Sequence, residues 1–167
     1  MGRVGRARLL AVCDPVALAH PTNRRVELEL KDLPPLEQID ADLKKCQDRT
    51  LIEQLWRKRC VRRNLGPGRT SRQSVWIWRM GDAVFLGQSN EAYACFQQRL
   101  RQRFTPAPIG VAGIVNGTYG YLPPAELYEK DIYQVWQTPF VQGSIERVQQ
   151  ACETAIERVL GAGASSE

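Results

Sequence analysis

The chain has 167 residues, of which 43% are hydrophobic and 25% charged, and its formal net charge is +5. This length and apolar share suit one globular domain with a hydrophobic core. No run of about 18 apolar residues occurs in the sequence, so we expect no transmembrane helix.

The N-terminal segment and the cysteines bear on the compartment. The apolar run Leu9–Cys13 follows three arginines, but Asp14 ends it short of the roughly 7–15 residues of a signal-peptide core. We therefore expect a poorly patterned helix or linker over residues 1–23, which hold the single histidine, His20. The five cysteines are scattered without a C-x-x-C pair, which predicts free thiols packed as small apolar side chains. Both features favour a reducing compartment such as the cytoplasm.

The first half of the chain carries clear secondary-structure signals. Alternating polar and apolar residues predict a strand over Arg25–Leu30. Apolar residues at helical spacing predict one long helix, or two in tandem, over residues 36–64, and Leu65–Gly68 breaks the pattern. The apolar runs Ser74–Met80 and Ala83–Leu86 flank a Gly-Asp turn and predict a β-hairpin.

The second half completes the predicted fold. We expect Glu91 to open a helix that the residues before it cap. The small apolar residues of Ile109–Val115 predict a strand buried on both faces. A Gly- and Tyr-rich loop follows, and Ser144 caps a last helix that precedes the tail 161–167. This order of elements indicates an α/β or α+β fold, with helices packed on a mixed sheet.

Two loops that follow strands carry the candidate chemistry. Gly87–Glu91 offers a carboxylate, and Val115–Pro123 offers phenols, with further tyrosines at 128 and 133. Sheets of α/β proteins place ligands beyond the carboxyl ends of their strands, so both loops are candidate ligand sites. The alternative is structural: Glu91 would complement a helix dipole from its first turn, and the tyrosines would be packed aromatics.

Four segments in the second half of the chain carry specific motifs. They are Met80–Glu91 (MGDAVFLGQSNE), Asn116–Tyr128 (NGTYGYLPPAELY), Asp131–Gln134 (DIYQ) and Thr138–Gly143 (TPFVQG). In this order they resemble motifs of the neutral/alkaline (non-lysosomal) ceramidase family. Those motifs read GD-x-x-hydrophobic-x-G-x-P-G-E, N-x-Y-x-x-Y-hydrophobic-x-T-x-E-x-Y, x-x-Y-E and, in bacterial members, S-P-F-x-x-G. The specific matches span about Arg72–Leu160, and a looser one reaches back to about Arg24.

The resemblance implies a zinc-dependent amidohydrolase that cleaves the N-acyl bond of ceramide into sphingosine and a fatty acid. Family members hold zinc with two histidines from their N-terminal half and with a Glu and a Tyr from their C-terminal half. The last two fall on Glu91 and Tyr121 of this chain. A second family tyrosine, near the substrate amide, falls on Tyr133 and would donate a hydrogen bond to the developing oxyanion. Residues 24–160 would then be the C-terminal part of a larger hydrolase domain.

The resemblance also implies an incomplete site. The histidines and the serine of the family's N-terminal half have no counterpart here, so we expect a fragment, a truncated product or a subunit. Such a chain binds zinc poorly and is inactive alone. An N-terminal half on another chain would complete it, and a lipid-like N-acyl amide would be its substrate. Two departures, Ser89-Asn90 for Pro-Gly and Thr118 for Tyr, leave open a degenerate paralogue that serves as a scaffold.

The basic stretch Arg49–Arg79 supports a different function. It contains nine Lys or Arg residues and one acid, Glu53, together with Trp56, Trp76 and Trp78. Positive charge with interleaved aromatics suits a non-enzymatic module that binds RNA, single strands or an anionic lipid surface. No nucleic-acid motif is visible, and a solvated helix face is the simpler alternative.

Overall fold

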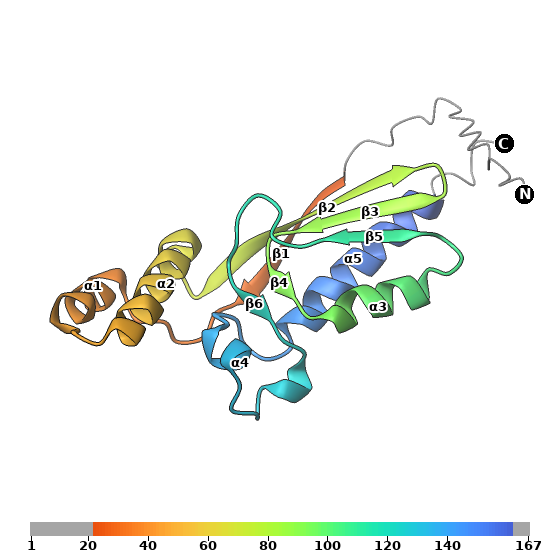
Figure 1. The fold of residues 1–167 in the computed structure, drawn as a ribbon. Helices are drawn as coiled ribbons and strands as arrows, with labels where there is room; N and C mark the ends of the chain where they lie inside the picture. Colours follow the sequence, from red (N-terminus) through yellow and green to blue (C-terminus); the bar gives the residue numbers. More distant parts are fainter. Residues whose placement is uncertain (1–21, 162–167) are drawn as a thin grey trace, which may run out of the picture.

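A computed structural model describes residues 22–161 (Figure 1). Side chains that alternate between buried and exposed along the first strands form a central sheet. Its strands, in spatial order, are β1 (Thr22–Glu29), β2 (Thr70–Met80), β3 (Ala83–Gln88) and β5 (Ile109–Ala112). β2 pairs antiparallel with both β1 and β3, whereas β3 and β5 are parallel. The predicted first strand, the β-hairpin and the mixed sheet are confirmed.

Two helices, α5 (Ser144–Gly161) and α3 (Ala94–Arg103), cover one face of the sheet (Figure 1). α5 lies against β1 and β2, as the apolar spacing of the predicted last helix requires. The buried side chains of this layer are Val26, Leu28, Val75, Ile77, Val84 and Leu86 from the strands and Ile145, Val148, Cys152 and Ile156 from α5. Burial of a large apolar side chain stabilises a fold by about 1.5–3 kcal/mol, so this layer is the core.

The opposite face of the sheet is not covered by any helix of the described part of the chain. Trp78 and Phe85 are cross-strand partners on that face, and Phe85 is 43% exposed. Gly110 leaves room for the Phe85 ring, since a Cβ at Gly110 would lie 2.9 Å from it. The prediction that Ile109–Val115 is a strand buried on both faces is therefore wrong. β5 ends at Ala112, which is exposed, because helices cover only one side of the sheet.

The long helical region forms two helices, α1 (Leu36–Lys45) and α2 (Arg49–Leu65), which settles the choice between one helix and two. The break comes at Asp48, whose carboxylate accepts a hydrogen bond from the Leu51 N–H at 2.9 Å and caps α2. Such a side-chain cap satisfies one of the free N–H groups of a new helix. The chain therefore starts a second helix there.

α1 and α2 pack on each other and lie together at one end of the sheet, so they do not cover its face (Figure 1). Arg59 of α2 pairs with Asp40 of α1, and Ile39 is buried between the helices and the segment after β1. The far side of α2 stays open: Trp56 is 56% exposed and Leu51 is 50% exposed. The expectation that all helices pack on the sheet is wrong for this helical hairpin, because its buried surface lies mainly between its own two helices.

A second, two-stranded parallel sheet continues from the end of β3. It consists of β4 (Glu91–Ala92) and β6 (Tyr121–Leu122). The prediction that Glu91 opens a helix is wrong, since α3 begins only at Ala94. The Glu91 N–H donates to the Gly120 carbonyl at 3.0 Å, and this pairing requires extended backbone at Glu91. A contact with a distant segment thus overrides the local helical signal.

The segment between β6 and α5 returns the chain to β1. It includes the short helices η1 (Ala125–Leu127) and α4 (Tyr133–Gln137). Phe140 is fully buried and forms a bridge with Leu30 at the end of β1. The Tyr128 hydroxyl lies 3.2 Å from the Phe140 carbonyl and 3.0 Å from the Val141 carbonyl, and burial raises the pKa of Tyr128 to about 12. Tyr128 is therefore a residue of the packed interior.

Parts of the expected organisation lie outside the described residues. Of the segment 1–23 only the last two residues are described, at the start of β1, and His20 lies outside. Of the tail 161–167 only Gly161, the end of α5, is described. Within residues 22–161 no helix has both the length and the apolar character needed to span a bilayer.

The cysteines that the structure describes are free and differ in exposure. Cys152 in α5 is fully buried, and burial raises the pKa of its thiol to about 12. Cys60 in α2 is exposed, whereas Cys46 and Cys95 are half-buried. The prediction of packed, apolar cysteines is confirmed for Cys152 and wrong for Cys60, because α2 turns that side chain to solvent.

Gly120 offers a test of the loop that leads into β6. Its φ is +120°, and a Cβ there would lie 2.8 Å from Cδ of Pro139. Gly120→Ala combines backbone strain with a steric clash, so we expect the free energy of unfolding to fall by about 1–3 kcal/mol. Denaturation followed by circular dichroism measures this change. Gly68→Ala is the matched control, with its nearest contact at 3.5 Å, and should change stability by less than about 0.5 kcal/mol. Equal stabilities of the two variants would contradict the strained loop.

Candidate functional site

A buried glutamine fixes the turn between β3 and β4. The Gln88 amide donates to the Asn90 carbonyl and accepts from the Asn90 N–H, with both distances at 2.6 Å. Gln88 and Asn90 are each 1% exposed, and hydrogen bonds are electrostatically stronger in such a low-dielectric interior. The next residue, Glu91, is exposed. The turn therefore presents the Glu91 carboxylate at a defined position beyond the end of β3.

β6 places Tyr121 beside Glu91. The two residues are direct partners in the parallel β4–β6 ladder, where neighbouring strands lie about 4.8 Å apart. The Tyr121 carbonyl accepts a hydrogen bond from the Thr138 hydroxyl at 2.7 Å, which ties β6 to the segment after α4. Two of the predicted site residues are thus held next to each other by the backbone pairing of β4 with β6 and by the Thr138 hydroxyl.

The third predicted residue, Tyr133, joins this pair from the first turn of α4. The rings of Tyr121 and Tyr133 pack edge to face, with their centroids 5.9 Å apart. Trp136 packs edge to face on Tyr133 at 4.9 Å, and Arg57 donates from Nη1 to the Tyr133 hydroxyl at 2.6 Å. The structure therefore brings Glu91, Tyr121 and Tyr133 into one cluster with a cation and an indole.

Arg57 and Trp136 are members of the cluster that the sequence did not assign to it. Arg57 precedes Tyr133 by 76 positions and stands in a run of similar basic residues on α2. Trp136 follows Tyr133 by one helical turn, and this i, i+3 spacing is the one signal that links it to the site.

The electrostatics of the cluster centre on Tyr121. Partial burial raises the pKa of this phenol, and the negative charge of the Glu91 carboxylate raises it further. Tyr133 and a hydrogen bond with Glu91 act in the same direction, whereas the positive charge of Arg57 lowers the pKa. The phenol is therefore protonated at neutral pH, and a cation between Glu91 and Tyr121 would favour its ionised form.

Glu91 and Tyr121 supply two hard oxygen donors, and a carboxylate oxygen is a common zinc ligand. Within residues 22–161 there is no group of three His, Cys, Asp or Glu side chains that could hold a metal ion. Catalytic zinc usually has three protein ligands and one open position. The pair therefore fits part of a zinc site, and the remaining ligands have to come from outside the described residues.

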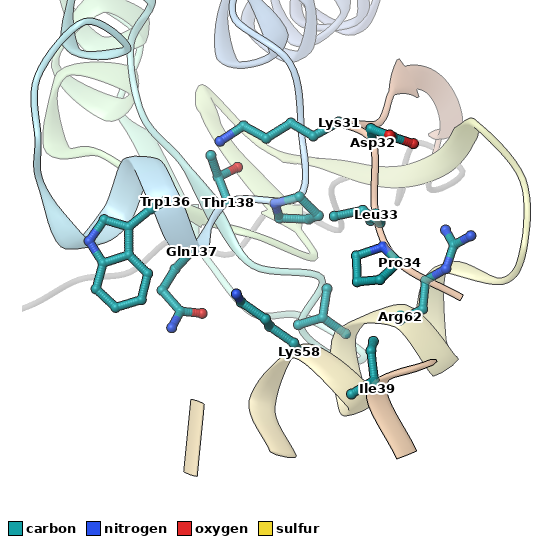
Figure 2. Close-up of a pocket in the computed structure, with 12 residues that line it drawn as sticks. Lys31, Asp32, Leu33, Pro34, Ile39, Lys58, Arg62, Trp136, Gln137 and Thr138 are labelled. Carbon is teal, nitrogen blue, oxygen red and sulfur yellow. The ribbon is translucent and has the colours of Figure 1, made fainter. Parts of the chain in front are cut away.

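An apolar pocket of about 180 Å³ adjoins the cluster between α2, α4 and the segment after β1 (Figure 2). Leu33, Ile39 and Val61 contribute to its apolar lining, and charged groups at its edge come from Lys31, Asp32, Lys58 and Arg62. Trp136 lines the same pocket and packs on Tyr133, so its indole ring separates the pocket from the tyrosine cluster. This volume leaves room for a small apolar group of a ligand.

Comparisons with known proteins add no assignment: no family model, no curated protein and no solved structure matches this chain. The resemblance to the neutral ceramidases therefore rests on the motifs that carry Glu91, Tyr121 and Tyr133.

The contact between Glu91 and Tyr121 predicts a change in titration. In Glu91→Gln the neighbouring negative charge is lost, so the phenol of Tyr121 ionises more easily and its pKa falls. NMR of the chain with ¹³C-labelled tyrosine ring carbons, recorded across the alkaline range, measures this value. Glu126→Gln is the control, because Glu126 is exposed, lies 4.0 Å from Arg99 and is not among the groups that shift the pKa of Tyr121. A pKa of Tyr121 that stays unchanged in Glu91→Gln would mean that the two side chains do not meet.

Proposed function

We propose that this chain is the C-terminal part of a zinc amidohydrolase of the neutral-ceramidase type, inactive alone and completed by a histidine-bearing part. The observation that carries this proposal is the convergence of Glu91, Tyr121 and Tyr133 at one end of the sheet. These are the three residues to which the motif resemblance assigns roles. The reaction is hydrolysis of an N-acyl amide, such as ceramide, to an amine and a carboxylate.

Each residue has a distinct task in this reaction. Glu91 and Tyr121 would hold the metal, and zinc, when bound, polarises a carbonyl and lowers the pKa of a bound water. Tyr133 would donate a hydrogen bond to the substrate carbonyl oxygen as negative charge develops on it. Donors that are already in place stabilise such charge strongly, because they need no reorganisation during the reaction.

The apolar pocket supports a substrate with a hydrocarbon part. It lies against Trp136, which packs on Tyr133, so an apolar group inside it stays within reach of the cluster. Each buried CH₂ contributes about 0.8 kcal/mol to binding. A lipid-like N-acyl amide matches an apolar pocket that adjoins a polar, oxygen-rich cluster.

The same geometry favours a retained half-site over a degenerate scaffold. Ser89 and Asn90 replace the Pro-Gly of the family motif, and both are buried, at 2% and 1% exposure. The Gln88 amide holds this turn through the backbone of Asn90, so the turn does not depend on proline or glycine. Glu91 therefore reaches Tyr121 in spite of the substitution.

A second candidate function is favoured by one surface of α2. Arg49, Ile52, Trp56 and Arg63 recur at helical spacing and are all exposed, with Leu51 beside them at 50% exposure. Aliphatic and indole groups between arginines suit the interface of an anionic bilayer.

Nucleic acid fits this surface less well than lipid does. Trp76 and Trp78 lie on β2, which starts after α2 ends, and Trp76 is about 20 Å along that strand at ~3.3 Å per residue. Trp56 thus stands without the other tryptophans, and stacking on successive bases needs a series of aromatic side chains.

Complementation tests the proposed hydrolase. The chain is mixed with the N-terminal half of a neutral ceramidase, which carries the two histidines and the serine, and hydrolysis of a fluorescent N-acyl sphingosine is followed. We expect zinc-dependent activity from the mixture and none from either part. Glu91→Gln and Tyr121→Phe should lower the rate at least about 100-fold, since even outer-sphere changes cost 10–100-fold. Glu126→Gln should behave like the unaltered chain. Activity of the chain alone, or an inactive complex of the two parts, would refute the proposal.

Vesicle binding tests the second candidate. Sedimentation with phosphatidylglycerol vesicles at low salt should capture the chain, and added salt should release it. Ile52→Ser combined with Trp56→Ser should weaken binding about tenfold or more, because each buried side chain is worth about 1.5–3 kcal/mol. Phe85→Ser, which removes an exposed apolar side chain from the sheet, is the matched control. Equal binding of the double variant and the control would rule out this surface.

A further inference from the structure

Arg57 connects the helical hairpin to the tyrosine cluster. Its guanidinium Nη1 lies 2.6 Å from the Tyr133 hydroxyl, although the two residues are 76 positions apart. Other bases of α2 serve the hairpin itself: Arg59 pairs with Asp40, and Arg62 donates to backbone carbonyls of the loop that follows α2. Arg57 is therefore directed at the candidate site, whereas its neighbours support their own helix.

The chemistry of the two groups sets the direction of this hydrogen bond. A guanidinium has donors only and stays protonated in proteins, so the Tyr133 oxygen has to accept. The phenol then has one hydrogen left to donate, and within the described residues this hydroxyl donates to no other group. Hydrogen bonds in series polarise one another and strengthen the final donor. Arg57 thus leaves Tyr133 with an oriented O–H that is free for a substrate oxygen.

The same cation acts on the second phenol. The rings of Tyr121 and Tyr133 pack edge to face with their centroids 5.9 Å apart, so the guanidinium that contacts Tyr133 also lies near Tyr121. Negative charge would develop at both phenols in the proposed reaction. Tyr121 would carry it as an anionic ligand, and the substrate oxygen bound by Tyr133 would carry it as an oxyanion. A positive charge near the two phenols stabilises both the ionised form of Tyr121 and the oxyanion next to Tyr133.

We infer that Arg57 is a positioning residue of this site, which orients the Tyr133 hydroxyl toward the substrate oxygen and offsets the negative charge that gathers on the two phenols. The inference deepens the proposed hydrolase and rests on it. Because Arg57 acts through Tyr133 on charge that appears during the reaction, its removal should lower kcat and leave KM nearly unchanged. The basic helix α2 thereby contributes one residue to the chemistry itself.

The first arm of the test uses the chain alone. In Arg57→Gln the ¹³C ring resonances of Tyr133 should shift, since no guanidinium donates to its hydroxyl any longer. Arg57→Lys should also shift these resonances, because the guanidinium contact is lost in both variants. Arg158→Gln removes an exposed arginine of α5 and should not change these signals. Unchanged tyrosine signals in Arg57→Gln overturn the inference.

The second arm uses the complemented enzyme. We expect kcat of Arg57→Gln to fall about tenfold or more, because loss of a preorganised hydrogen-bond donor lowers kcat, and we expect KM to stay within about twofold. Arg57→Lys should fall between Arg57→Gln and the unaltered chain, and Arg158→Gln should be fully active. Normal kcat in Arg57→Gln overturns the inference even if the hydrolase proposal stands. If the unaltered chain stays inactive with its partner half, the hydrolase proposal fails, and the tyrosine signals alone decide whether Arg57 controls the two phenols.

Discussion

Burial of α5 against the sheet is the interaction on which the rest of the structure depends. Ile145, Val148 and Ile156 are fully buried on β1 and β2, and such side chains contribute about 1.5–3 kcal/mol each. The segment that leads into α5 is thereby drawn against the end of β1, where Phe140 meets Leu30. That segment also carries the Thr138 hydroxyl that holds β6. The position of the candidate site therefore follows from the packing of the core.

The candidate site is built by backbone more than by side chains. A ladder of two residues on each strand is short, and it is supported on one side by the Gln88 amide and on the other by the Thr138 hydroxyl. Backbone contacts therefore fix the neighbouring positions of Glu91 and Tyr121, while the Glu91 side chain is exposed and the Tyr121 ring packs edge to face on Tyr133. Side chains that are not needed for packing are available for chemistry, and Tyr128, which packs against Phe140, shows the opposite case.

The sequence correctly predicts those helices and strands in which apolar residues recur with the period of the element and form one buried face. Periodicity predicts strands over residues 25–30 and 74–80 and a helix from Ser144, and the structure has strands over 22–29 and 70–80 and a helix over 144–161. Glu91 was misplaced on a helix because a two-residue strand has no period and depends on a partner far along the chain. The nearness of Glu91 to Tyr121 is what the motif resemblance implies, because it assigns both to one metal, whereas the pairing of β3 with β5 that places the two loops side by side is seen only in the structure. The role of Arg57 was not, because nothing in a run of basic residues distinguishes the member that meets Tyr133.

The buried thiol of Cys152 has a practical consequence. Alkylating reagents attack the thiolate, and a thiol with a pKa of about 12 in the middle of the core forms almost none. Cys60, which is exposed on α2, has no such protection. Modification of Cys152 requires α5 to leave the sheet, so the rate of its alkylation reports how often that happens. The chain thus carries a natural reporter of local opening at the helix that holds the whole domain together.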